Sequence, residues 1–478
     1  RPGRHSQPSR SDEGSQSDDD RPRRHTPRRA PAESRPPVSG PSVQFGDFTI
    51  RGVAAKFLQD QEQASGQPLT PTPIQAMALS PIYEGESVVL QAPTGTGKSL
   101  AFLLPLLQRL EEEAWRAPHS GLRLLILVPT GDLQLQLAGL TRALVGPGRA
   151  ETVCVLRRDM DNTAVRGVIV ISTPRQIEDL LKDPLTANVW APALAGLDMV
   201  VVDEADRLLD NFTGRHQRKR AREQGVINPC EMVLKRIVEE TKLAKRSLHW
   251  QLVAASATVN RRTQRSLSYS AGVELKLLRA EGAPLPQGSV SLGQYREGTS
   301  NWPAGLKHTL RVVKPFFFNT AISAVADTIA DLRAERVLVA IADTVDGSRA
   351  ARVPKADFGL NPVTGVLRSR LERLGYKVGT CSSAVEAATR MWVPSANQAR
   401  GNRDMKEVIV GSAEAIRGIH LSDIDAVIIL GDPVSVTQYL HCAGRTCRYR
   451  HDSGDSGKPS GGSVVTVCTE NVADRMIN

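Results

Sequence analysis

The sequence predicts an α/β protein in which two tandem parallel-sheet domains follow a disordered N-terminal arm. Three observations predict this class: continuous apolar runs of strand length recur along the chain, segments with helical periodicity separate them, and the N-terminal segment lacks both patterns. Strands that are covered on both faces have continuous apolar runs, because neither face meets water. A chain of 478 residues is also too long for one ordinary hydrophobic core.

Residues 1–44 are the expected arm. The segment is rich in arginine and proline, and its residues 11–20 form an acidic run, "SDEGSQSDDD". It has too little apolar surface to offset the conformational entropy that folding would remove. A solvated spacer and an arm that touches RNA are equally compatible with this composition.

Residues 45–280 are the expected first domain. Its buried strands are predicted from the apolar runs at residues 87–90, 122–128, 167–172, 198–202 and 250–256. The polar stretch 281–305 contains prolines and glycines and is the expected interdomain linker. The alternation resumes in a second domain, residues 306–478. Its strands are predicted at residues 336–341, 376–380, 407–412, 426–430 and 462–467.

The charge balance favours a polyanionic partner. Lys and Arg number 61 against 51 Asp and Glu, which gives a formal net charge of +10. Nucleic acid is preferred over a membrane surface, although many proteins carry a mild basic excess without such a partner. No stretch approaches the ~18 consecutive apolar residues of a membrane-spanning helix, so no membrane partner is expected.

A glycine-rich turn between a strand and a helix predicts a nucleotide site. The turn lies in "LQAPTGTGKSL", residues 90–100. Backbone N–H groups at a helix N-terminus bind phosphate oxygens, and glycines allow the phosphates to come close. We expect Lys98 to contact the β- and γ-phosphates of ATP and Ser99 to bind Mg²⁺. The expected contacts of the turn are Ala92, Thr94, Gly95, Thr96, Gly97, Lys98 and Ser99. Because Ala92 opens the turn in place of glycine, a chance glycine-rich turn is the alternative.

An acidic pair ends one of the predicted strands. Asp203 and Glu204 follow the apolar run "MVVV". Ligands of open α/β sheets bind at the carboxyl ends of the strands, and a buried acidic pair is costly unless it holds a cation or a water. We expect Asp203 to bind Mg²⁺ and Glu204 to orient or deprotonate an attacking water.

Four motifs, in this order, make the chain resemble the DEAD-box ATP-dependent RNA helicases. They are "PTPIQ" at residues 71–75, "DEAD" at 203–206, "SAT" at 256–258 and "HCAGRTCR" at 441–448. The resemblance extends from about residue 45 to the C-terminus. It implies two RecA-like domains that bind and hydrolyse ATP with Mg²⁺ and act on RNA.

The resemblance also implies roles for individual residues. Gln75 would read the adenine edge, and Phe48 would stack on the ring. Thr258 belongs to the segment that couples hydrolysis to strand separation in the family. Arg445 and Arg448 would stabilise charge at the γ-phosphate. The implied RNA-binding residues are Pro129, Thr130, Thr173, Pro174, Arg417 and Gly418.

The chain departs from the family pattern mainly where the family contacts RNA or joins its two domains. After "PT" the family has arginine, glutamate, leucine and alanine, whereas this chain has "GDLQ" at residues 131–134. The family's "TPGR" is "TPRQ" at residues 173–176. Further departures are Arg157 and Arg158 for a glycine pair, Ser412 and Ala413 for threonine–aspartate, His420 for aspartate and Cys442 for arginine. The ATP-facing set of the first domain is nearly whole.

Three functions fit this pattern. We expect an RNA helicase, or RNA-dependent ATPase, that works in ribonucleoprotein assembly, with ribosomal RNA and ribosomal or assembly proteins as partners. The alternatives are an ATP-binding pseudo-helicase that clamps RNA and a P-loop ATPase that acts on another polymer. The basic run "RHQRKRAR" at residues 215–222 is either a solvated helix or a contact for structured RNA.

The N-terminus favours a mitochondrial location. The chain begins at Arg1 rather than at methionine, so we expect a segment to precede it. Arginine- and serine-rich arms occur after mitochondrial presequences, although the acidic run argues against this arm being the presequence itself. Nucleolar and cytoplasmic locations are the alternatives.

Overall fold

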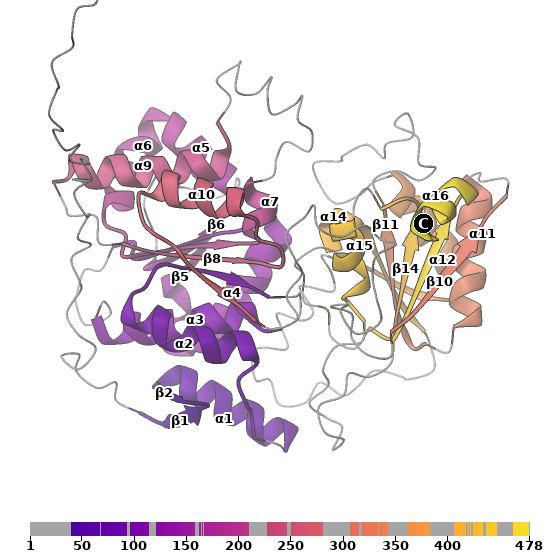
Figure 1. Cartoon of the computed structure of the whole chain (residues 1–478), viewed down its shortest axis with the longest axis horizontal. Helices are drawn as coiled ribbons and strands as arrows, with labels where there is room; N and C mark the ends of the chain where they lie inside the picture. The colour runs from indigo at the N-terminus through magenta and orange to yellow at the C-terminus, as the bar shows by residue number, and fades with distance from the viewer. Residues whose placement is uncertain are drawn as a thin grey trace, which may run out of the picture.

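Two parallel β-sheets, each with helices on both faces, form the framework of the computed structural model (Figure 1). The structure describes residues 40–66, 68–92, 96–113, 121–157, 162–163, 165, 167–209, 227–245, 250–280, 306–314, 318–332, 334–342, 362–381, 383, 406–416, 419, 421, 424–433, 436–446 and 462–477. Most of the expected arm, the whole expected linker and the basic run 215–222 lie outside these residues.

Within the described residues, the first sheet has seven strands in the order β5-β6-β4-β7-β8-β3-β9. All of its neighbouring strands are parallel. The strands are β3 (Val88–Gln91), β4 (Leu124–Leu127), β5 (Val153–Val155), β6 (Ile169–Ser172), β7 (Met199–Asp203), β8 (Gln251–Ser256) and β9 (Lys276–Arg279). The helices are α1 (Val53–Ser65), α2 (Pro73–Glu84), α3 (Lys98–Glu113), α4 (Gly131–Val145), α5 (Pro174–Lys182), α6 (Pro184–Ala195), α7 (Ala205–Leu209), α9 (Pro229–Leu243) and α10 (Arg261–Ala271), with a 3₁₀ turn at Pro147–Thr152.

The continuous apolar strands build two separate cores, one on each face of this sheet. Successive side chains of a strand point to opposite faces. Val88 and Leu90 therefore enter the core that α1 to α4 cover, whereas Val89 enters the core under α5, α6, α7, α9 and α10. The same alternation repeats in β4, β6, β7 and β8. Both faces are buried, which is why the interiors of these strands are apolar and their polar residues stand at the strand ends.

A small antiparallel hairpin precedes the first sheet. Its strands are β1 (Ser42–Phe45) and β2 (Phe48–Arg51). Gly46, in the hairpin turn, has φ 63°, and a Cβ there would lie 2.7 Å from the Pro71 ring. The hairpin turn therefore lies against the start of the "PTPIQ" segment. β1 begins at Ser42, within the range that the sequence assigns to the arm. The hairpin is ordered there because its residues Phe45 and Ile50 pack into the first core.

The second sheet has six described strands in the order β10-β15-β14-β11-β13-β12, and its neighbouring strands are parallel. They are β10 (Leu306–Val312), β11 (Arg336–Ile341), β12 (Lys377–Thr380), β13 (Glu407–Ser412), β14 (Ala426–Leu430) and β15 (Gly462–Cys468). The described helices are α11 (Phe318–Asp331), α12 (Pro362–Arg373), α14 (Ala413–Ile416), α15 (Val436–Ala443) and α16 (Glu470–Ile477). α11 and α12 cover one face of this sheet, and α14 and α15 cover the other.

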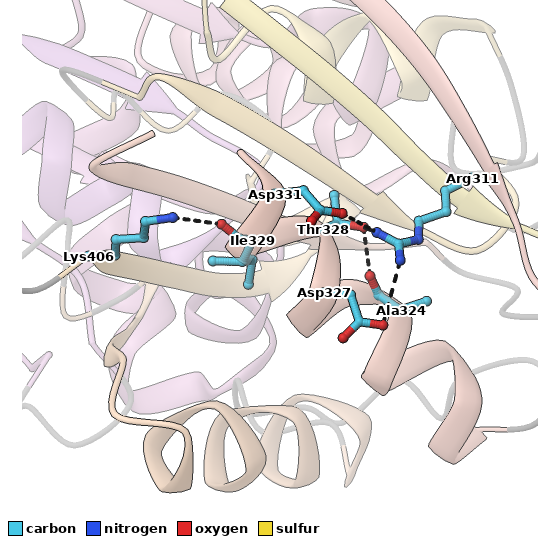
Figure 2. A network of polar contacts seen from close by, with 7 residues as sticks. All are labelled: Arg311, Ala324, Asp327, Thr328, Ile329, Asp331 and Lys406. Carbon is cyan, nitrogen blue, oxygen red and sulfur yellow. Dashed lines mark hydrogen bonds and ion pairs between the residues drawn. The ribbon is translucent and has the colours of Figure 1, made fainter. Parts of the chain in front are cut away.

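Polar contacts attach α11 to β10 and to the residue before β13, as Figure 2 shows. Arg311 of β10 donates to the Thr328 hydroxyl at 2.9 Å and pairs with the Asp331 carboxylate at 3.1 Å. Lys406, which precedes β13, donates to the backbone carbonyls of Ile329 and Leu332, each at 2.9 Å. These carbonyls belong to the end of the helix, where the backbone lacks intrahelical donors. The exposed ion pair adds little, so the lysine is the more effective anchor.

None of the helices in the described ranges combines the length and the apolar character that crossing a membrane requires.

A substitution at Gly167, which precedes β6, would test how tightly the backbone packs beside the first sheet. The φ of Gly167 is +95°, and a Cβ there would lie 2.5 Å from the Thr152 carbonyl oxygen. We expect Gly167→Ala to lower the free energy of unfolding by about 1–3 kcal/mol, because the backbone must move or accept strain. Gly148→Ala is the matched control, since no heavy atom lies within 4 Å of its Cβ position. Urea unfolding that shows equal stability for both variants would contradict the expected close approach.

Candidate functional site

The candidate residues of the first domain lie along one edge of the first sheet, where its parallel strands end. In the paired register Gln91 of β3 faces Ser256 of β8, and Asp203 of β7 faces Ala255 of β8. The ends of β3, β8 and β7 are therefore side by side. β4 and β6 end further along the same edge. This edge is where ligands bind in open parallel sheets.

The turn after β3 ends in a buried lysine. Lys98 is the first residue of α3, and its Nζ donates to the Ala92 carbonyl at 2.9 Å. Gly97 has φ 81°, and a Cβ at this position would lie 2.3 Å from Nε2 of Gln75. Glycine is therefore favoured there, because other residues rarely adopt this φ and their Cβ would displace the Gln75 amide. Ser99 follows in the first turn of α3 and is half-buried, whereas Thr94 and Gly95 lie outside the described residues.

The "PTPIQ" segment holds this turn in place through the start of α2. Thr72 caps the helix, and the Gln75 side chain accepts from the Thr72 N–H at 2.9 Å. The Thr72 hydroxyl donates to the Thr96 carbonyl at 2.7 Å, and Nε2 of Gln75 donates to the Gly97 carbonyl at 3.1 Å. The spacing T-x-x-Q is a capping-box signature, so this support was readable in the sequence. The expected adenine contact of Gln75 stays a prediction.

Phe48 lies at the start of β2, in the hairpin that abuts Pro71. Its ring meets the Tyr83 ring edge-on, with centroids 5.3 Å apart. The ring is half-buried and also packs against the first core. The expected stacking of Phe48 on adenine stays a prediction.

Three buried carboxylates lie at the end of β7 and just after it. Glu204 has φ 50°, in the left-handed region that non-glycine residues rarely adopt. Its backbone N–H donates to Oδ1 of Asp203 at 3.0 Å. The Asp206 carboxylate accepts from the Thr258 hydroxyl at 2.6 Å, which joins "DEAD" to "SAT". Strain of this kind persists where the surrounding structure enforces it, and it often accompanies function.

Burial and charge shift the proton affinities of this cluster. Burial, and then the neighbouring Glu204 carboxylate, raise the pKa of Asp203 to about 7, against the opposing effect of Lys98. Burial lowers the pKa of Lys98, while the carboxylates of Glu204, Asp203 and Asp206 raise it. Lys98 is thus a buried cation whose pKa responds to three buried acids, and perturbed groups of this kind are typical of functional sites.

Arg445 brings the second domain into the electrostatics of the site. The side chain is buried, its Nε donates to the His441 carbonyl at 2.9 Å, and it also donates to the Ile419 carbonyl. Its charge contributes to lowering the pKa of Lys98. Carbonyl groups of the second domain therefore hold the guanidinium, and its charge lowers the pKa of Lys98 in the first domain. Its expected role at a γ-phosphate stays a prediction, and Arg448 lies outside the described residues.

The RNA-binding candidates that the structure describes lie at the ends of β4 and β6. Thr130 caps α4 and accepts from the Leu133 N–H at 3.4 Å. Thr173 caps α5, with Pro174 as its first residue. Pro129 precedes Thr130 at the end of β4. Two helix N-termini thus face the same sheet edge. Arg417 and Gly418 lie outside the described residues.

Two residues of the site were not among the candidates. Asp206 anchors Thr258, and Thr72 anchors the turn after β3. Asp206 is the last letter of the "DEAD" motif, but nothing in the sequence shows that its carboxylate reaches the "SAT" segment. Thr72 could have been found from its capping-box spacing.

Comparison with known proteins identifies relatives of both domains. Residues 72–267 match the family model "DEAD/DEAH box helicase", and residues 356–450 match "Helicase conserved C-terminal domain". Together the two ranges cover more than half of the chain.

Two curated relatives align over most of this chain. The "ATP-dependent RNA helicase MSS116, mitochondrial" of Meyerozyma guilliermondii is 26% identical over 391 residues, which are 79% of this chain and 49% of the relative. The "ATP-dependent rRNA helicase RRP3" of Eremothecium gossypii is 25% identical over 395 residues, 81% of this chain and 65% of the relative. The chain therefore spans less than two thirds of either protein.

A solved structure supports the fold. The structure of Mss116p bound to single-stranded RNA and AMP-PNP has a TM-score of 0.60 and 21% identity, and covers 88% of this chain and 73% of that one. The likeness extends over two RecA-like domains, as the sequence predicts. Both helicase family models match in order, and the "DEAD" motif begins at the end of β7, beside the end of β8. The chain therefore belongs to the DEAD-box helicase family.

Proposed function

We propose that the chain is an ATP-dependent RNA helicase, or RNA-dependent ATPase, of the DEAD-box family. The observation that carries the proposal is the buried cluster at the ends of β3, β7 and β8. In it the buried Lys98 ammonium interacts electrostatically with the carboxylates of Asp203, Glu204 and Asp206, and the Thr258 hydroxyl donates to the Asp206 carboxylate. Family membership supports the same reaction.

The residues of this cluster fit a nucleotide with a divalent cation. Mg²⁺ prefers oxygen ligands, and the Asp203 carboxylate and the Ser99 hydroxyl would hold it. Lys98 would bind the β- and γ-phosphates, and Gly97 leaves space in a turn where a Cβ would collide with Gln75. When bound, Mg²⁺ neutralises charge that develops on the phosphates.

The chain's own side chains supply the remaining steps. Glu204 is buried beside Asp203, so its carboxylate can orient an attacking water and accept the water's proton. Arg445 would balance negative charge from the second domain. The Thr258–Asp206 hydrogen bond connects the segment after β8 to the segment after β7, so a shift of the carboxylates reaches the "SAT" segment directly.

RNA is the proposed substrate, within an assembling ribonucleoprotein. Support comes from the net charge of +10, from Thr130 and Thr173 at one edge, and from a relative that is named an rRNA helicase. We therefore propose ribosomal RNA, with ribosomal or assembly proteins as partners. The departures at the RNA-facing positions favour a second candidate, a pseudo-helicase that clamps RNA. An ATPase that acts on another polymer is the third.

We propose a mitochondrial location, supported by the arginine-rich arm and by a relative that is named mitochondrial. Imaging of the native full-length protein with a C-terminal tag tests it. A purely nucleolar or cytoplasmic signal would contradict this location without affecting the proposed reaction.

The first prediction from the proposed function concerns nucleotide binding. Lys98→Ala should abolish binding of a fluorescent ATP analogue, because the phosphates lose their buried cation. Lys56→Ala is the control, since Lys56 is an exposed lysine of α1 in the same domain. Circular dichroism should show that both variants fold. Unchanged affinity for the ATP analogue in a folded Lys98→Ala protein would contradict the proposal that this turn binds a nucleotide.

A second prediction separates hydrolysis from binding. Glu204→Gln keeps the shape of the side chain but removes the charge that accepts a proton. It should preserve ATP affinity and slow turnover by roughly 10²-fold or more. Glu239→Gln, on the exposed side of α9, should leave turnover unchanged. Equal, low turnover in wild type and Glu204→Gln would mean that the chain is a pseudo-ATPase.

A third prediction tests specialisation for structured RNA. Poly-U should stimulate turnover weakly, because the family's RNA-facing residues are altered. Joint neutralisation of the basic run should reduce affinity for structured ribosomal fragments more than any single change in the motifs, and the loss should shrink at high salt. The variant changes Arg215, Arg218, Lys219, Arg220 and Arg222, which lie outside the described residues. Strong poly-U stimulation without a loss from this variant would indicate a general helicase.

A further inference from the structure

Two departures from the family pattern lie in contact with each other. Gln134 stands in α4 where the family has alanine, and Gln176 stands in α5 where it has arginine. Nε2 of Gln134 donates to Oε1 of Gln176 at 2.8 Å. Gln134 is only 3% exposed. A buried amide is costly without partners, so the substitution at one position makes the polar residue at the other tolerable.

Both amides also bind the ends of neighbouring strands. Nε2 of Gln134 donates to the Ile171 carbonyl of β6 at 3.1 Å, and Nε2 of Gln176 donates to the Leu156 carbonyl after β5 at 3.0 Å. Oε1 of Gln176 accepts from the N–H of Thr173 at 2.9 Å and from its hydroxyl at 3.0 Å. The pair therefore fastens α4, α5, β5 and β6 together at the edge that carries the RNA candidates.

This arrangement moves the positive charge by one residue. The side chain at 176 is uncharged and turned back toward its own helix cap. The preceding residue, a glycine in the family, is Arg175, and it is exposed at the second position of α5. In the first turn of α5 the positive charge is therefore carried by Arg175 instead of by residue 176. Guanidinium groups bind phosphate oxygens with strong, charge-assisted hydrogen bonds.

We propose that Arg175 binds a phosphate of the RNA and that Gln134 and Gln176 are the positioning pair that holds it there, beside Thr130 and Thr173. The inference rests on the proposed RNA function and names the contact that replaces the family's arginine. The pair touches no RNA itself. It acts by fixing the first turn of α5, from which Arg175 projects.

The first arm of the experiment measures the charge. Binding of a labelled single-stranded RNA to the full chain, with AMP-PNP present, is followed by fluorescence anisotropy at several salt concentrations. Arg175→Ala should weaken binding and reduce the slope of log K against log salt by about 0.7, the value for one lost phosphate contact on a single strand. Arg142→Ala is the control, an exposed arginine at the opposite end of α4. It should change neither quantity.

The second arm measures coupling. Gln134→Ala should weaken RNA binding several-fold in the wild-type background and have no further effect in an Arg175→Ala background. Gln251→Ala is the control, because Gln251 is an equally buried amide that donates to the Ile82 carbonyl at 2.9 Å from the start of β8. It should lower stability without changing RNA affinity. The swap Gln134→Ala with Gln176→Arg should restore the affinity that Gln134→Ala loses, because it adds a cation at position 176 beside the retained Arg175.

The outcomes distinguish this inference from the proposed function. An unchanged salt slope in Arg175→Ala, with tight RNA binding by the wild type, overturns the Arg175 contact alone. Additive losses from Gln134→Ala and Arg175→Ala, or an equal RNA defect in Gln251→Ala, make the pair merely structural and overturn the positioning role. Failure of the wild type to bind any RNA overturns the proposed function together with this inference.

Discussion

The buried charge cluster at the ends of β3, β7 and β8 is the constraint on which the rest of the first domain depends. One buried ammonium, that of Lys98, lies within the electrostatic influence of three buried carboxylates. Such a group of charges is strongly unfavourable unless it is held rigidly and balanced. Its neighbourhood shows what that rigidity requires. Glu204 takes a left-handed backbone conformation, Gly97 leaves no space for a side chain, and Gln75 ties the turn to α2. An excess of buried acid is also what a Mg²⁺ ion would neutralise, so the same imbalance that strains the chain suits it to a metal-bound phosphate.

The central strands could be predicted from the sequence because both of their faces are buried. The predicted ranges 336–341, 407–412 and 426–430 coincide with β11, β13 and β14. The strands that the sequence did not reveal include β5, β9 and β10, which lie at sheet edges. β9 and β10 alternate less clearly and carry exposed polar residues, so neither a continuous apolar run nor a strict period of two marks them.

The site followed the same rule at the level of single residues. Roles that depend on local spacing, such as the glycine-rich turn and the threonine caps, can be predicted from neighbouring residues in the sequence. Contacts between distant segments are not. Thr258 and Asp206 are separated by 52 residues, and Gln134 and Gln176 by 42, so only the fold shows that each pair is bonded. The altered "TPRQ" segment accordingly looked like an eroded RNA site in the sequence, whereas the structure gives its glutamine a set of hydrogen bonds.

The order of the strands explains how the proposed nucleotide side and the proposed RNA side of the edge can change independently. β7 lies between β8 and β4, so it separates the ends that carry Lys98 and Thr258 from those that carry Thr130 and Thr173. The nucleotide side is organised by charges, and substitutions there would unbalance a buried cluster. The RNA side is organised by neutral amides and helix caps, which can be replaced in matched pairs without leaving a buried charge. We therefore expect substitution of paired positions to be tolerated near β4 and β6 and much less near β3 and β7. The scaffold of the RNA side contains no ion pair of its own among the bonds described for Gln134 and Gln176, so salt should act on the contact with RNA rather than on the scaffold that presents it.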